Sequence, residues 1–470
     1  MQKALSQDKV QKYLRKSLIL IILIKLFVYF IFPAFVFIKT EYKESVLKSS
    51  ARGRDPFGVE APGGTSKLSN LNSSSIDNLN PNWIQWFVGF TDGEGNFHIS
   101  LDSKKSFVRF RFKIALHADD LNVLQNIQSK LGIGSARLES DGKTAVFVVQ
   151  NLDQIKNVII PIFDRYNLQS VKVLDYLSFK EAIVIKGDSG KLSDDQFNRI
   201  QSIKESMNFK RTDYFGYNQN IFNITPYWLL GFVEAEGTFG IKNLTPYFQV
   251  AQSNKSKNLM EAIKVYLSDL PKDQLNNLST SVKPSSVKNK TTGVISLMVT
   301  DIDSLYDNLL PFFDSLNFES RKYIDYKLWS AALKMHKLGH FYLPEGRTLL
   351  IRLANSINTN RYSTADKIIK LPTEEEINQI LNLPNPFDLS TGKSHITLAR
   401  EFVKSKRVKG EFKVYVYQNG VEVPNSPYVS YYAVQKDLGF KGNRTVSRYI
   451  DTDKVYGDGF IFYTYSKNNK

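Results

Sequence analysis

Two acidic residues stand at corresponding places in two short stretches of the sequence. The stretch WFVGFTDGEGNFHIS (86–100) contains Glu94, and the stretch WLLGFVEAEGTFGIK (228–242) contains Glu236. In each, a helix-like apolar run leads into the acid and then into a glycine, Gly95 or Gly237, that favours a helix end. The helix dipole places partial negative charge at that end, so a carboxylate there needs a compensating cation.

Small residues in the same stretches predict how the two acids come together. Each stretch has a pair of them four positions apart, on one face of a helix, where they allow another helix to approach closely. These candidate interface residues are Gly89, Gly93, Gly231 and Ala235. If the helices pair through these faces and end together, Glu94 and Glu236 become neighbours that repel each other. A divalent cation with oxygen ligands, Mg²⁺ or another such as Mn²⁺, would relieve the repulsion.

The sequence repeats itself around these stretches. The segment IIPIFDRYNLQSVKVLDYLSF (159–179) is matched by LLPFFDSLNFESRKYIDYKLW (309–329), which pairs Lys172 with Lys322. Each copy has the same coarse order of helix, strands, helix, strand and helices. Two copies of one domain in a chain predict a pseudo-two-fold arrangement, with one subdomain at 81–215 and the other at 216–362.

Composition restricts the classes of partner and chemistry. Lys and Arg number 62 against 46 Asp and Glu, for a formal net charge of +16, which fits nucleic acid or an acidic membrane surface. The chain has no cysteine, which excludes disulfide scaffolds, thiolate zinc sites and cysteine nucleophiles. The five histidines show no zinc-ligand spacing.

The ends of the chain lie outside the repeat. Residues 17–38, SLILIILIKLFVYFIFPAFVFI, are long and apolar enough to span a bilayer, so they predict a membrane anchor or the remnant of a fused membrane protein. A polar, Ser- and Asn-rich linker completes the N-terminal region 1–80. Beyond the repeat we expect a linker at 363–410 with a helix at TEEEINQIL, and a compact module at 411–470.

The two acidic stretches resemble the motif of the LAGLIDADG homing endonucleases in their single-chain, two-motif form. FVGFTDGEG (87–95) and LLGFVEAEG (229–237) carry the resemblance, which extends from about Asn82 to about Arg361. It implies an α+β fold of two αββαββα subdomains, with the motif helices at their interface and antiparallel sheets over DNA. The protein would be a monomer that acts as a pseudo-dimer.

The resemblance also implies roles for single residues. The family's metal-binding catalytic acid falls on Glu94 and Glu236, and its active-site lysine on Lys172 and Lys322. A glutamine at the end of the second strand matches Gln252 in the second copy, but the first copy has Leu116 there. Asp92 and Glu234, at the preceding acidic position, are expected to structure the helix ends.

Alternating strands supply the predicted DNA surface. In FVRFRFKI (107–114) the residues Arg109, Arg111 and Lys113 share one face, and Tyr247 and Gln249 are their second-copy counterparts. The C-terminal module resembles the small helix-turn-helix modules found beside homing endonucleases. Its candidate phosphate contacts are Lys436, Lys441, Arg444 and Arg448.

The expected function is metal-dependent double-strand cleavage of a long asymmetric DNA target, which promotes intron mobility. The alternative is a maturase that binds group I intron RNA and assists splicing, and the two roles can coexist. Retained acids and lysines in both copies favour cleavage. The sequence is rich in residues with AT-rich codons, namely Phe, Tyr, Asn, Lys and Ile, which points to an organellar genome. The resemblance implies a mitochondrial protein encoded in a group I intron. Residues 17–38 leave membrane association open.

Overall fold

The computed structural model describes 79–102, 107–188, 190–214, 217, 221–270, 280–285, 293–358, 370–440 and 445–467. The predicted membrane segment at 17–38, nearly all of the N-terminal region and three residues named above, Arg361, Lys441 and Arg444, lie outside these ranges. Within them, no helix has the length and apolar character needed to cross a membrane.

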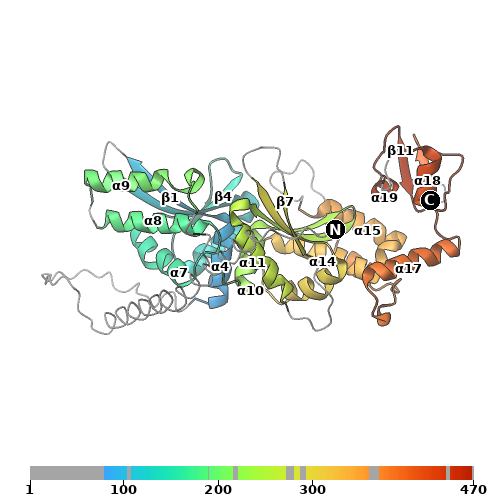
Figure 1. Ribbon diagram of the computed structural model, residues 1–470, viewed down its shortest axis with the longest axis horizontal. Helices are drawn as coiled ribbons and strands as arrows, with labels where there is room; N and C mark the ends of the chain where they lie inside the picture. The colour runs from blue at the N-terminus through green and yellow to red at the C-terminus, as the bar shows by residue number, and fades with distance from the viewer. Residues whose placement is uncertain are drawn as a thin grey trace, which may run out of the picture. The chain divides into compact units, whose positions relative to one another are not determined.

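Each copy of the repeat folds into a helix followed by an antiparallel sheet and further helices (Figure 1). The first copy consists of α4 (Pro81–Glu94), β1 (Gly95–Asp102), β2 (Phe107–His117), α5 (Leu121–Leu131), β3 (Ser135–Leu138), β4 (Thr144–Val149), α6 (Leu152–Gln154), α7 (Ile160–Arg165), α8 (Lys172–Lys186) and α9 (Asp194–Glu205).

The second copy repeats this order. It consists of α10 (Pro226–Glu236), β5 (Gly237–Lys242), β6 (Thr245–Ser253), α11 (Lys257–Ser268), β7 (Thr280–Ser285), β8 (Val294–Val299), α12 (Ile302–Ser304), α13 (Leu310–Asp314), α14 (Lys322–Leu338) and α15 (Pro344–Ser356). In Figure 1, α4 and α10 lie side by side at the centre, between the two sheets.

The two sheets have the same topology and register. Their strand orders are β1-β2-β4-β3 and β5-β6-β8-β7. Gly95 pairs with Ile114 in the first sheet, and Gly237 pairs with Val250 in the second. This register makes Leu116 and Gln252 equivalent positions, and likewise Arg111 and Tyr247.

Side-chain alternation places each sheet on the core. In β2, Phe110, Phe112 and Ile114 are buried while Arg109 is exposed and Arg111 is partly exposed, as the period of two requires. The aromatic rings of the first copy pack together with Phe97 at their centre, and those of the second pack around Phe239. Apolar burial against α4 and α10 therefore fixes which face of each sheet points outward.

The C-terminal region contains more secondary structure than the sequence predicted. Residues 370–410 contain two helices, α16 (Glu374–Leu381) and α17 (His395–Val408), where one helix was expected. The module contains β9 (Tyr415–Gln418), β10 (Val421–Glu422), α18 (Tyr431–Leu438), α19 (Thr445–Tyr449) and β11 (Phe460–Tyr463), with a sheet of order β10-β9-β11. Its helices pack on a sheet with a core of its own, so helix-turn-helix describes only half of it.

Candidate active site and DNA interface

The close contact of α4 with α10 depends on glycine. A Cβ atom on Gly89 would lie 2.0 Å from the carbonyl oxygen of Trp228, and one on Gly231 would lie 2.0 Å from that of Trp86. A Cβ on Gly93 would lie 2.3 Å from the Cβ of Ala235. The helix backbones therefore touch, and the two helices end beside each other.

Asp92 is buried next to the end of α4 and accepts hydrogen bonds from both subdomains. The backbone amides of Gln169 and Ser170 each donate to it at 2.8 Å, and the indole Nε1 of Trp228 donates at 2.9 Å. Burial raises the pKa of Asp92, and these donors oppose the rise. The carboxylate ties α4 to the loop before α8 and to the opposite subdomain.

Glu234 repeats this arrangement in the second subdomain. It accepts from the backbone amides of Glu319, at 3.0 Å, and Ser320, at 2.6 Å, and from Nε1 of Trp86, at 2.8 Å. Burial raises its pKa as well, against the same kinds of donor. Both acids therefore order the helix ends and the loops that carry the lysines.

The glycines after the motif acids serve a different purpose from the one expected. Gly95 has a φ of −70° and Gly237 a φ of −80°, both in extended backbone rather than the left-handed region. A Cβ on Gly95 would lie 2.4 Å from Thr91 Cγ2, and one on Gly237 would lie 2.6 Å from the carbonyl oxygen of Val233. Glycine is needed here because the strand starts against its own helix.

The two lysines reach the ends of the motif helices. Lys172 and Lys322 are the first residues of α8 and α14, and their backbone amides donate to Ser170 Oγ and Ser320 Oγ, each at 3.3 Å. Lys172 Nζ donates to the carbonyl oxygen of Gly93 at 2.8 Å, whereas Lys322 Nζ donates to that of Gly237 at 3.0 Å. The lysines are equivalent in the repeat, but Lys172 contacts the residue before its acid in the sequence and Lys322 contacts the residue after its acid.

Both motif acids have raised pKa values. Burial and the charge of Glu236 raise the pKa of Glu94 to about 7, while Lys172 opposes the rise. Burial also raises the pKa of Glu236, and a hydrogen bond from the Gln252 side chain, together with both lysines, opposes the rise. The structure thus brings together the acids, the lysines and Gln252.

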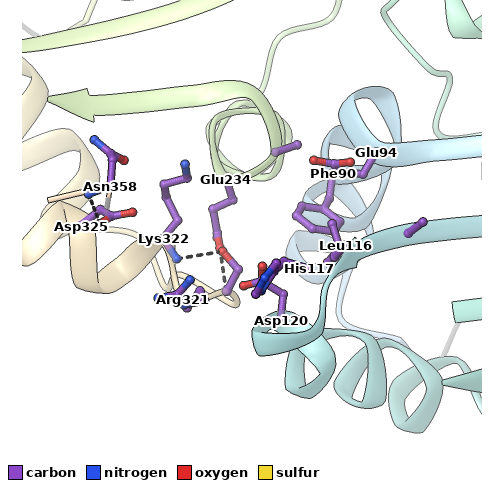
Figure 2. Close-up of a pocket in the computed structure, with 13 residues that line it drawn as sticks. Phe90, Glu94, Leu116, His117, Asp120, Glu234, Arg321, Lys322, Asp325 and Asn358 are labelled. Carbon is purple, nitrogen blue, oxygen red and sulfur yellow. Dashed lines mark hydrogen bonds between the residues drawn. The ribbon is translucent and has the colours of Figure 1, made fainter. Parts of the chain in front are cut away.

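Glu94 lines a cleft of about 330 Å³ whose walls come from both subdomains (Figure 2). Leu116, His117 and Asp120 come from the first subdomain, and Arg321 and Lys322 face them from the second. Leu116 occupies the place of Gln252, so the two half-sites differ in their polar groups.

The donor set fits a divalent cation that shares its ligands with substrate. Among the described residues, no three His, Asp or Glu side chains are placed to hold a metal ion by themselves. Two desolvated, mutually repelling carboxylates nevertheless fit an ion such as Mg²⁺, which takes one or two carboxylates and completes its coordination with phosphate and water oxygens.

The outward face of the first sheet is basic. Arg109, Arg111 and Lys113 follow one another along β2, and His98 of β1 is the cross-strand partner of Arg111. Burial and the neighbouring cations Arg111, Lys204 and Lys113 lower the pKa of His98. Phosphate groups would relieve this concentration of positive charge.

The outward face of the second sheet is neutral at the equivalent positions. Tyr247 stands in place of Arg111 and Gln249 in place of Lys113, by the register given above. The Tyr247 ring covers Gly240, where an added Cβ would lie 2.4 Å from ring carbon Cζ. In the C-terminal module, Lys436 lies on α18 and Arg448 is exposed on α19.

Sequence reasoning missed the two tryptophans and Asp120. Trp86 and Trp228 each precede the first small residue of their stretch by three positions, and this shared position was the available signal. Asp120 has Ser256 as its repeat equivalent, so comparison of the copies offered no signal for it.

Known proteins share the motifs and the fold described above. A family model described as LAGLIDADG endonuclease matches residues 87–183 and 229–333. An uncharacterized mitochondrial protein of Saccharomyces cerevisiae, RF1, is 30% identical over 336 residues, which cover 66% of this chain and 67% of that protein. The chain belongs to the LAGLIDADG endonuclease family.

Other family members are similar over comparable lengths. A probable intron-encoded endonuclease of Schizosaccharomyces pombe, Cox1-I1b, is 29% identical and aligned over 61% of this chain and 72% of its own length. The LAGLIDADG homing endonuclease I-GzeII, solved with its DNA target, has a TM-score of 0.50 and 26% identity, covering 60% of this chain and all of that one. Meganuclease I-SmaMI, solved with uncleaveable DNA, has a TM-score of 0.50 and 27% identity, with 59% and 97% coverage.

Several sequence predictions are thereby confirmed. They are the LAGLIDADG family, the α+β fold with two subdomains, the endodeoxyribonuclease class and the mitochondrial location.

Proposed function

We propose that this LAGLIDADG protein is a site-specific homing endonuclease that makes metal-dependent cuts in both strands of a long, asymmetric DNA target and thereby promotes mobility of its intron. The observation that carries the proposal is the pairing of Glu94 with Glu236 at the adjoining ends of α4 and α10. A lysine from each subdomain donates to the same helix ends.

Each half-site is proposed to act on one strand. A divalent cation, when bound, lowers the pKa of a water nucleophile and neutralises charge at the phosphate. Glu94 and Glu236 would hold the cation, and Lys172 and Lys322 would place positive charge where the phosphate gains negative charge. The Gln252 amide, already bonded to Glu236, orients water in the second half-site.

The lengths of the strands support a long target. β2 has 11 residues and β6 has 9, so at about 3.3 Å per residue each spans roughly 30–36 Å. With a helix rise of about 3.4 Å per base pair, each sheet covers about nine to eleven base pairs. Because one face is basic and the other neutral, the two half-sites of the DNA would differ.

The maturase alternative explains less of the structure. RNA binding uses neither a pair of desolvated carboxylates nor a lysine directed at each of their helix ends. Cleavage accounts for both, and so it is the function proposed.

The decisive experiment selects duplexes from a randomised library by cleavage in Mg²⁺. We expect wild-type protein to cut both strands of a single extended site. The Glu94→Gln, Glu236→Gln double variant should bind the selected duplex with similar affinity and leave it intact. Glu181→Gln, an exposed acid on α8, is the matched control and should cut normally. Full cutting by the double variant would overturn the assignment of the acids.

A further inference from the structure

A second cleft, of about 360 Å³, lies between the second subdomain and the C-terminal module and shares no lining residue with the cleft at Glu94. Its walls include the turn between β5 and β6, helix α15 and the segment that starts at α19. Among the described residues that line it are three cations, Arg347, Arg448 and Lys454, and no carboxylate.

This charge sets the cleft apart from its neighbours. The cleft at Glu94 also contains Asp120 and Asp325, and another cleft beside α15 and α16 contains Glu345, Glu376 and Glu411. Arg347 is paired with Asp451, so Arg448 and Lys454 supply the positive charge that favours an anionic ligand. Arg448 and Lys454 are exposed and hence accessible to a large one.

The cleft continues the outward face of the second sheet. Thr245, the first residue of β6, lines it, and Tyr247 and Gln249 follow on the same face of that strand. At the other end of β6, Gln252 contacts Glu236. The eight residues from Thr245 to Gln252 are seven steps apart along the strand and span about 24 Å, or about seven base pairs of DNA.

An ion pair holds the module against this end of the subdomain. Arg347 of α15 donates from Nη2 to the carbonyl oxygen of Ile450 at 2.8 Å, and its Nε lies 2.5 Å from Asp451 Oδ2. The Asp451 side chain is 4% exposed and also accepts from the amide of Thr464 at 2.7 Å. Breaking a buried ion pair of this kind costs free energy. The pair therefore fixes the position of Arg448, three residues before Asp451, at the edge of the cleft.

We propose that this basic cleft binds the phosphate backbone of duplex DNA beyond the outer end of the second half-site, so that the C-terminal module lengthens the target on that side alone. The inference rests on the proposed function and adds where a further DNA contact lies on the protein and on which side of the target it falls. The ligand is B-form DNA, since the cleft continues the sheet face proposed to follow the duplex.

The test measures binding of the full chain to the library-selected duplex, without cleavage, by fluorescence anisotropy. One duplex keeps both flanks, and two others are trimmed on one side to about six base pairs from the cut. We expect trimming of one flank to weaken wild-type binding at least tenfold and trimming of the other to change little. Gln249→Ala, through its effect on base preference, identifies the second half-site, which must be the sensitive side.

The Arg448→Ala, Lys454→Ala variant should bind the untrimmed duplex as weakly as wild type binds the trimmed one, and trimming should not weaken it further. Its log–log salt slope should fall by about 1.8, or about 0.9 for each lost phosphate contact. Arg400→Ala, Lys404→Ala removes the same charge from exposed positions on α17 and should behave as wild type. Unchanged thermal unfolding confirms that the variants fold.

Equal wild-type affinity for all three duplexes would overturn the inference while leaving the proposed function intact. So would a cleft variant that loses affinity for structured intron RNA but not for DNA. Failure to select any cleavable duplex would instead contradict the proposed function itself.

Discussion

The indole Nε1 of Trp86 donates a 2.8 Å hydrogen bond to Glu234 of the opposite subdomain. The reverse bond joins Trp228 to Asp92 at 2.9 Å. Each subdomain thus supplies one of the donors that satisfy the buried acid of the other. Unsatisfied buried carboxylates are costly, so these bonds couple the folding of the two halves.

Trp86→Phe should destabilise the protein by about 1–3 kcal/mol, because the buried Glu234 loses one of its donors while the aromatic packing is kept. Urea unfolding at neutral pH measures the change. Trp83→Phe is the matched control: Trp83 is buried in the same helix, but its Nε1 makes no hydrogen bond to a described residue. Equal losses from the two substitutions would show that the Trp86 bond contributes nothing.

Cleavage should depend on pH through Glu94, whose pKa is raised to about 7. Below that pH the carboxyl keeps its proton and cannot hold a cation, so at low Mg²⁺ the rate should fall about tenfold per pH unit. Higher Mg²⁺ should move the midpoint to lower pH, because the cation competes with the proton. A midpoint that stays fixed as Mg²⁺ varies would argue against Glu94 as a metal ligand.

The same shift predicts a stability change in protein without metal. The unfolded chain releases the Glu94 proton near pH 4.5 and the folded chain near pH 7, so stability falls as pH rises through this window. Glu94→Gln removes the loss and should be more stable than wild type at pH 8, on the order of 1–3 kcal/mol, but not at pH 4.5. Thermal melts at both pH values provide the comparison.

The strands of the target should be cut at different rates. Gln252→Leu copies Leu116 into the second half-site and removes a polar contact to Glu236. It should slow one strand about tenfold, the usual effect of one lost hydrogen bond of about 1.4 kcal/mol. Separate end labels on the two strands measure this. Leu116→Gln should leave that strand unchanged, and equal slowing of both strands by Gln252→Leu would contradict a separate role for each half-site.

Salt dependence should separate the two sheet faces. Arg109→Ala and Arg111→Ala should weaken binding, change the salt slope by about 0.9 per lost phosphate contact, and alter one half-site. Gln249→Ala should change base preference in the other half-site with little change in slope, because a neutral amide releases no counterions. Binding across a salt series, on targets randomised one half at a time, gives both quantities. A preferred palindromic target would rule out this division.

Local periodicity made much of the fold predictable. The alternation that placed Arg109 and Phe110 on opposite faces of β2 follows from strand geometry, and Gly132 ends α5 with a φ of +67°, as a glycine stop should. The repeat located the lysines because the copies align residue by residue. Each of these signals lies within a few positions of the residue that it describes.

Features set by distant residues could not be predicted. Asp92 depends on amides 77 and 78 residues away, and nothing near Asp92 in the sequence indicates them. Helix α17 is amphipathic but lies in a polar region that we interpreted as a linker, and β11 becomes a strand by pairing with β9, far earlier in the chain. Lys172 and Lys322 contact different carbonyls although they are equivalent in the repeat, so comparison of the copies did not predict this difference.

The glycine contact between Gly89 and the Trp228 carbonyl has an evolutionary consequence. Because the halves meet backbone to backbone here and exchange one indole bond each way, either half could be exchanged for a relative's half that retains this glycine, the tryptophan and the buried acid. Outward strand positions such as Arg111 and Tyr247 make no contribution to that fit and can change independently. Chimeric proteins built by joining halves at this helix pair should therefore fold while combining two unrelated target preferences.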